Sequence, residues 1–419
     1  MRVARGPATW ARRGILAAVL VAAVVAPGRA SSLQVKHCTG LRCTQPGSVL
    51  WTRPLAGSWF AQPGVSGTVT SPDGAFAASG GGLAVLGTGL AVTAVSESTG
   101  KQVWRVPLTG FPASSAIVGV RAFTGVVAVG VEPSQGRATT RDEVILSDAT
   151  GASVRTYRAA PYGGAVAATA ASTVIVGQHK VTDYANATGQ VIWSRPTGSA
   201  GQTWRVAGGD IYITGDSGAG ASAAARPEIQ QISLTDGTER TLHHPSGGFR
   251  GTLTEVIGSD LLFTGPDGVD VYNKAGRPLW SRASASVELT DAGRGVVYLA
   301  SGSKLIGVDI SSGAVVTWAP ISVAASLYWV TDGVALGLDQ NGLGEAWGYD
   351  LGTRKVVWSS SGVPWPHFFV DLSGLGGSAS AGSDIVLLAS CARVGAAKAA
   401  NSAPVCARPE LTAVLVTAR

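Results

Sequence analysis

The sequence predicts an all-β fold, a β-propeller of eight four-stranded blades, and three observations support this prediction. A short phrase of turn and strand residues recurs along the chain, the segments before each turn are β-rich or alternate in polarity, and the two chain ends complement each other. The composition agrees, with 57 glycines, 45% hydrophobic residues and 14% charged residues. Such values are typical of many short strands joined by tight turns.

The repeated phrase is a polar turn that is followed by an apolar pair and a tryptophan. In the clear copies the tryptophan lies four residues after a glycine, as in Gly100 and Trp104, Gly189 and Trp193, and Gly276 and Trp280. Trp51 and Trp358 keep this spacing, with arginine in place of glycine before Trp358. Weaker copies follow three further glycines and lead to Arg155, Leu242 and Trp318.

The eight turn positions define the period of the repeat. They are residues 47, 100, 151, 189, 237, 276, 313 and 354. Periods of about 40 to 50 residues are typical of propeller blades or helical repeats. The segments 90–95, 143–146, 269–272 and 304–309 favour strands. Each phrase therefore predicts the hairpin between the third and outermost strand of a blade. Seven blades remain an alternative, because two copies are degenerate.

The tryptophans of the phrase are expected to pack between neighbouring blades. A large aromatic side chain buries about 150 to 250 Å², enough to fill the space between two twisted sheets. The predicted blade-packing residues are Trp51, Trp104, Trp193, Trp280, Trp318 and Trp358.

The chain ends predict a closed ring. Residues 47–51 are an outer strand without three strands before it, whereas the strands at 384–389 and 411–416 lack an outer strand after them. Joining the two ends completes one blade and removes two open sheet edges.

The first 30 residues are expected to be a secretory signal peptide. Four arginines precede an apolar run over residues 15–26, and small residues ending at Ala30 follow. The run has 12 residues, whereas a membrane-spanning helix needs about 20. We expect cleavage after Ala30, with membrane anchoring through residues 14–26 as the alternative. Residues 31–44 are then a cysteine-containing lead-in, and residues 45–419 form a single propeller domain.

Without the leader, the chain is nearly neutral. Five of the 32 basic residues lie in the first 30 residues, which contain no acid, and the chain has 26 acidic residues in all. The sequence has no basic stripe with interleaved aromatic residues, so no nucleic-acid partner is expected.

The four cysteines are expected to form disulfides, because an exported chain folds in an oxidising compartment. Of the three connectivities we favour the local pairs, Cys38 with Cys43 and Cys391 with Cys406. A zinc site at His37, Cys38 and Cys43 is disfavoured, because the spacing matches no zinc motif.

The phrase Ser98-Thr99-Gly100-Lys101-Gln102-Val103-Trp104 and its copies resemble the repeat of the PQQ-like, or quinoprotein alcohol dehydrogenase-like, β-propellers over nearly all of residues 45–419. The resemblance implies one of two functions. Some members are dehydrogenases with pyrroloquinoline quinone and calcium, and others are non-catalytic scaffolds, such as the outer-membrane assembly lipoprotein and actinobacterial exported proteins. The adjacent Cys-Cys pair of the dehydrogenases does not occur in this sequence.

Most motifs with a chemical interpretation have a simpler structural one. Gly215-Asp216-Ser217-Gly218 copies a protease nucleophile segment but lies in a Gly/Ser/Ala-rich loop, and His243-His244 lies in a predicted loop. Asp309 and Asp350 are expected to accept hydrogen bonds from turn amides. Asn186-Ala187-Thr188 fits a glycosylation pattern but is also a repeat turn.

A dense aromatic cluster interrupts the last blade and is the best local candidate for a partner surface. Its predicted contact residues are Trp365, Phe368 and Phe369.

The sequence therefore predicts an exported, monomeric, non-catalytic scaffold that binds a protein or cell-envelope component. It assigns no catalytic residue, no cofactor and no metal site. The alternatives are a PQQ-dependent dehydrogenase, by fold analogy, and a propeller that binds a glycan or small ligand.

Overall fold

A computed structural model shows residues 36–419 as one compact unit, and all the described residues belong to it. The signal peptide, Cys38 and Cys43 lie outside the described residues. The described residues are 45–54, 59–60, 76–132, 141–159, 163–177, 179–197, 203–214, 229–242, 249, 251–320, 327–338, 346–359, 369–371, 385–394 and 405–416.

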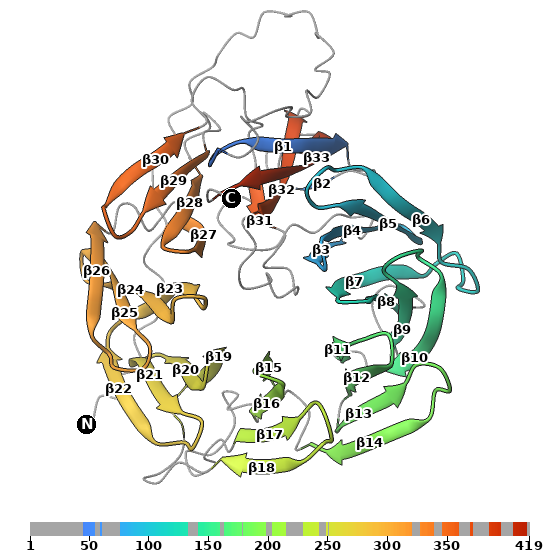
Figure 1. The fold of residues 1–419 in the computed structure, drawn as a ribbon, viewed down its shortest axis with the longest axis horizontal. Coiled ribbons are helices and arrows are strands. Elements are labelled where there is room, and N and C mark those ends of the chain that lie inside the picture. Colours follow the sequence, from blue (N-terminus) through green and yellow to red (C-terminus); the bar gives the residue numbers. More distant parts are fainter. Residues whose placement is uncertain are drawn as a thin grey trace, which may run out of the picture. The chain divides into compact units, whose positions relative to one another are not determined.

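The described strands form eight antiparallel sheets, which are the blades of a β-propeller (Figure 1). Blade 1 contains β3 (Phe76–Gly80), β4 (Leu83–Thr88), β5 (Ala91–Ser96) and β6 (Gln102–Pro107). Blade 2 contains β7 (Ala116–Phe123), β8 (Val126–Glu132), β9 (Arg141–Ser147) and β10 (Ser153–Ala159). Blade 3 contains β11 (Gly164–Ala168), β12 (Ser172–Val176), β13 (Lys180–Ala185) and β14 (Val191–Pro196).

The next four blades repeat the same strand order. Blade 4 contains β15 (Thr203–Ala207), β16 (Asp210–Thr214), β17 (Ile229–Ser233) and β18 (Glu239–Leu242). Blade 5 contains β19 (Thr252–Ile257), β20 (Asp260–Gly265), β21 (Gly268–Asn273) and β22 (Pro278–Ala283). Blade 6 contains β23 (Ser286–Asp291), β24 (Val296–Ser301), β25 (Lys304–Asp309) and β26 (Val315–Pro320). Blade 7 contains β27 (Leu327–Thr331), β28 (Val334–Leu338), β29 (Ala346–Asp350) and β30 (Lys355–Ser359).

Blade 8 is built from both ends of the chain. The C-terminal part supplies β31 (Phe369–Asp371), β32 (Ile385–Val394) and β33 (Val405–Leu415), and the N-terminal part supplies the outer strand β1 (Val49–Pro54). The short strand β2 (Trp59–Phe60) also pairs with β33. The prediction of a ring closed by both chain ends is confirmed, and Figure 1 shows β1 beside β33.

The number of blades is eight because the two degenerate copies of the phrase also form complete blades. The phrases that lead to Arg155 and Leu242 give the outer hairpins of blades 2 and 4, with the same four-strand order as the others. The turn glycines have positive φ, for example +65° at Gly100 and +71° at Gly151, which glycine adopts without steric cost.

The core consists of the apolar faces of the blades, packed against each other around the ring. The second strands are almost fully buried, as in β8 and β24, because both of their faces contact neighbouring blades. One cluster joins Val85 and Val92 of blade 1 to Val127 and Val129 of blade 2. The described residues contain no helix, and hence none that is long and apolar enough to cross a membrane.

Candidate functional site

The tryptophan of one blade packs on the turn glycine of the next blade. Trp51 is fully buried, and its indole N–H donates to the Glu97 carbonyl at 2.6 Å. A β-carbon placed on Gly100 would lie 2.6 Å from the indole ring. Position 100 therefore favours glycine for two reasons, a positive φ and the close approach of an aromatic ring.

The same contact recurs around the ring. Trp104, Trp193, Trp280 and Trp358 each lie against the glycine of the following turn, and three of them donate an indole N–H to a backbone carbonyl of that turn region. For Trp358 the glycine is Gly47 and the carbonyl belongs to Val416, so both chain ends complete this contact.

An arginine two residues after the tryptophan adds a second contact in three blades. Arg195 donates from Nε to the Gly237 carbonyl at 2.6 Å, and Arg282 donates to the Gly313 carbonyl at 2.9 Å. Arg53 makes a longer contact of 3.4 Å with the Gly100 carbonyl. Sequence reasoning missed this contact, although the Trp-x-Arg spacing at these three positions was the signal.

Trp318 is placed differently from the other predicted blade-packing tryptophans. The position four residues after Gly313 is Thr317, whose hydroxyl donates to the Leu351 carbonyl of blade 7 at 2.5 Å. Trp318 comes one residue later, and adjacent residues of a strand point to opposite faces. Its side chain is therefore 43% exposed, with the Arg354 guanidinium 4.6 Å from the ring centroid.

Trp365 and Phe368 lie outside the described residues, and of Phe369 only the backbone, in β31, is described. The backbones of Cys391 and Cys406 lie on the adjacent strands β32 and β33, and their disulfide stays a prediction.

Two turn residues behave as the sequence predicts, and one glycosylation pattern has a structural explanation. Asp309 and Asp350 each accept hydrogen bonds from backbone N–H groups of their turns. Asn186 is buried, and its Oδ1 accepts hydrogen bonds from Tyr157 at 2.9 Å and Thr173 at 2.8 Å. A buried amide with these partners serves the fold.

All described outer strands except β18 carry a β-bulge directly before the docking position, which is the residue whose side chain contacts the next blade. In β30, for example, Tyr349 pairs with Val356 and Gly348 pairs with Trp358, so Val357 is the extra residue. A bulge reorients the side chain that follows it, and here the side chain at the docking position points toward the next blade. The cost is an exposed apolar side chain at Val103, Val154, Ile192, Leu279, Val316 and Val357.

Among the described residues, large exposed apolar side chains are most numerous on the neighbouring blades 6 and 7. We define the outer apolar patch as Val315, Val316, Trp318, Val356 and Val357, which are 43 to 56% exposed. Arg354 connects its two halves, because its guanidinium lies over Trp318 while its backbone precedes β30. The strands β26 and β30 are the outermost strands of their sheets, at the rim of the ring (Figure 1).

A buried charge cluster ties blade 2 to blades 3 and 4. Glu143 is buried and forms ion pairs with Arg141 at 3.4 Å and Arg121 at 3.7 Å. It also accepts a hydrogen bond from the Ala165 backbone at 2.8 Å. The Arg121 guanidinium lies 5.4 Å from the Trp204 ring centroid, and burial lowers the pKa of Arg121.

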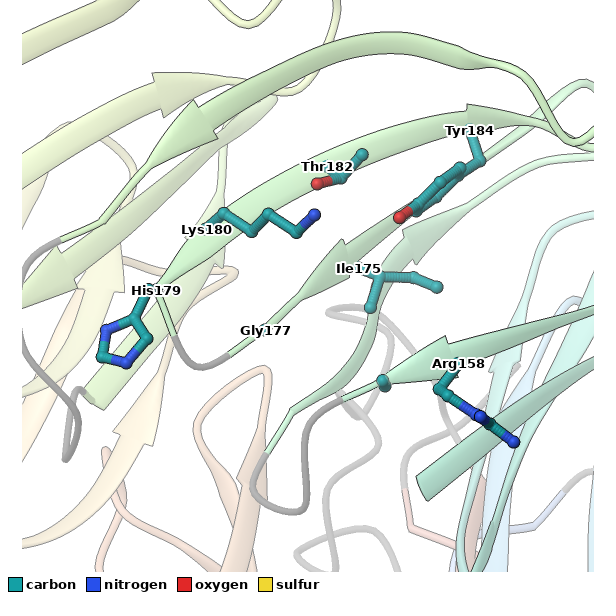
Figure 2. A pocket seen from close by; sticks show the side chains of 8 residues that line it. Arg158, Ile175, Gly177, His179, Lys180, Thr182 and Tyr184 are labelled. Carbon is teal, nitrogen blue, oxygen red and sulfur yellow. The ribbon is translucent and has the colours of Figure 1, made fainter. Parts of the chain in front are cut away.

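Two cavities open between blades. One, of about 260 Å³, lies between β10 of blade 2 and blade 3, and is lined by Arg158, Ala159, Ile175, Gly177, His179, Lys180, Thr182 and Tyr184 (Figure 2). The other, of about 430 Å³, lies between blades 5 and 6 and contains the carboxylates of Glu255 and Glu288. Burial raises the pKa of Glu255.

Among the residues that the structure describes, no three His, Cys, Asp or Glu side chains lie close enough together to hold a metal ion.

Solved structures of other proteins are similar to this chain. BamB from Moraxella catarrhalis matches at 19% identity and a TM-score of 0.40, over 72% of this chain and 91% of that one. A eukaryotic initiation factor matches at 13% identity and a TM-score of 0.50, over 80% and 89%. A europium-containing methanol dehydrogenase matches at 11% identity and a TM-score of 0.44, over 82% and 84%. At these identities a likeness concerns the fold alone.

No curated protein matches the sequence. A family model described as outer membrane protein assembly factor BamB matches residues 92–360. Since this match covers more than half of the chain, the chain belongs to the family of PQQ-like repeat propellers described by that name.

Proposed function

We propose that the chain is an exported, non-catalytic scaffold of the cell envelope that binds a protein partner along the outer strands of blades 6 and 7. The observation that carries the proposal is the outer apolar patch, five exposed apolar side chains on two neighbouring edge strands. Membership in a family described by an assembly factor supports a protein as the partner.

The edge strands give the patch two means of binding. Each of β26 and β30 has a ladder partner on one side only, so N–H and C=O groups on the other side face outward. An extended partner segment adds a strand to such an edge through its backbone, while side-chain contacts provide specificity. The exposed valines and Trp318 are the side-chain contacts that this chain offers.

Affinity capture with paired variants tests the proposal. We expect the mature chain to retain a defined protein from a cell-envelope extract, and Val316→Glu with Val357→Glu to lose it. Val103→Glu with Ile192→Glu is the matched control, because these residues occupy the same bulge position in blades 1 and 3. Equal retention by both double variants, measured by quantitative mass spectrometry, would refute the patch as the binding surface.

Export is a separate part of the proposal. The apolar segment at residues 15–26 and its arginine-rich flank support it. N-terminal sequencing of the chain from the cell envelope is expected to begin at Ser31. A chain that is recovered only from the cytoplasm with its N-terminus intact would contradict export.

A further inference from the structure

The interface (seam) between blades 2 and 3 is built differently from the interfaces in which a tryptophan of one blade packs on the turn glycine of the next. The docking position on β10 is Arg155, which donates to the Asn186 carbonyl at 3.1 Å and the Ala187 carbonyl at 2.6 Å. Next along the strand, the rings of Tyr157 and Tyr184 stack with centroids 4.7 Å apart. These contacts close the outer end of the seam.

Beyond the tyrosine pair the seam opens into the cavity of about 260 Å³. The next residue of β10 on this face is Ala159, whose side chain is too small to reach the facing strand. On blade 3, Ile175 pairs with Thr182 in the ladder, so both side chains lie on the face that lines the cavity. The cavity therefore exists because a small residue follows two large ones on the outer strand.

The described residues that line this cavity include the basic side chains of Lys180 and Arg158 and the imidazole of His179. None of its described lining residues carries a carboxylate. The nearest ion pair joins Arg158 Nε to Asp142 Oδ1 at 3.7 Å, and the Arg158 side chain is 75% exposed. Within the described part of the chain, Lys180 and His179 form no ion pair.

Two polar groups converge on the same space. In Figure 2 the Lys180 amine and the Tyr184 hydroxyl are directed toward the space beside Ile175, whereas Arg158 and His179 stand at opposite sides. The Thr182 hydroxyl is already engaged with the Ser194 hydroxyl at 3.0 Å. The cavity thus offers one ammonium and one phenol to a ligand, over an apolar floor.

We infer that this cavity, between β10 and β13, binds a small organic anion. Lys180 and Tyr184 would hold its carboxylate or phosphate head group, and Ile175 and Ala159 would contact a compact apolar body. An ammonium group is a strong donor to both kinds of anion. The volume of about 260 Å³ is large enough for a single-ring compound. This site is independent of the protein-binding surface on blades 6 and 7.

Calorimetric titration of the purified mature chain with benzoate, phenyl phosphate and benzyl alcohol tests the inference. Both anions are expected to bind with dissociation constants on the order of 1 mM or tighter. Benzyl alcohol, which has the ring without the charge, is expected to bind at least about tenfold more weakly, since a charged hydrogen bond is lost. The ratio of the two anion affinities tells whether the head group is a carboxylate or a phosphate.

Two variants locate the binding. Lys180→Gln is expected to weaken both anions about tenfold or more, and Tyr184→Phe, which keeps the stacked ring, by about threefold to tenfold. Lys304→Gln is the matched control, because Lys304 lies near Trp318 in blade 6 and should leave both affinities unchanged. Unchanged melting temperatures show that the variants fold. Absence of anion binding, or equal effects of Lys180→Gln and Lys304→Gln, would overturn the inference.

Discussion

The indole N–H of Trp358 donates to the carbonyl of Val416, 3.1 Å away, and thereby joins blade 7 to the last described residue of the chain. Gly47, from the other end, covers the same ring. One side chain thus contacts both ends of the propeller. Trp358 of blade 7 thus holds the N-terminal and C-terminal segments of blade 8 together.

Replacement of Trp358 is expected to destabilise the closed ring strongly. Trp358→Ala removes a buried indole, which typically costs about 3 to 5 kcal/mol. Trp318→Ala is the control, because Trp318 is 43% exposed, and should cost about 1 kcal/mol or less. Urea unfolding followed by fluorescence measures both. Similar losses in the two variants would show that the Trp358 contact does not secure the ring.

The turn glycines are expected to be required for packing as well as for backbone conformation. Gly100→Ala combines the strain of a positive φ, about 1 to 2 kcal/mol, with a clash against Trp51 that adds about 1 to 3 kcal/mol. Gly82→Ala has a similar φ of +79° but open space around the new methyl group, so it carries the strain alone. The difference between the two unfolding free energies isolates the packing contribution, and a difference near zero would contradict it.

The buried charge cluster gives a third prediction. Glu143→Gln leaves Arg121 and Arg141 without their anion in a buried site and should cost about 3 to 5 kcal/mol. The adjacent Asp142→Asn removes the ion-pair partner of the exposed Arg158 side chain and should cost about 1 kcal/mol or less. Thermal unfolding at neutral pH compares the two variants. A loss for Glu143→Gln no larger than that for Asp142→Asn would argue against a stabilising cluster.

Acid should weaken the outer turn of blade 6. Hydrogen bonds from the Ser312 and Ser311 hydroxyls hold the pKa of Asp309 below its ordinary value. Because the folded pKa is lower than the unfolded one, the carboxylate stabilises the fold fully above about pH 4, and this contribution disappears as the pH falls through the folded pKa.

Asp309→Asn separates this pH effect from the turn geometry. Asn273 already ends β21 of blade 5, and its Oδ1 accepts from the Ala275 and Arg277 backbone N–H groups. We therefore expect the variant to keep its turn, and to lose less of its melting temperature than the wild type between about pH 5 and about pH 2.5. Equal decreases in melting temperature over this pH range for the two proteins would show that Asp309 contributes nothing to acid sensitivity.

The sequence was sufficient for the fold because the phrase encodes both a turn and its packing partner. Glycine at a tight turn and tryptophan four residues later specify one hairpin per blade, and the incomplete ends at Trp51 and Trp358 specify closure. The degenerate phrase at Arg155 still forms a blade, because its guanidinium replaces the indole in donating to the next turn.

The surfaces were harder to predict, because they depend on single-residue shifts and on cavities. Trp318 points outward because it lies five residues after Gly313 instead of four, and Thr317 takes the docking position. The apolar pair before it makes this copy of the phrase look like the others. The cavity beside Lys180 depends on Ala159 facing blade 3 across a seam, and no local pattern encodes contact between distant strands. Trp365 and Phe368, the predicted partner surface, lie outside the described residues.

Site-specific photocrosslinking in cells tests the protein-binding proposal most directly. A photoreactive amino acid would replace Val316 or Val357 in the outer apolar patch and, as a control, Ile192 at the same bulge position of blade 3. The account predicts that positions 316 and 357 crosslink to the same cell-envelope protein and that position 192 does not. Absence of a crosslink at positions 316 and 357, or the same adduct at all three positions, would contradict it.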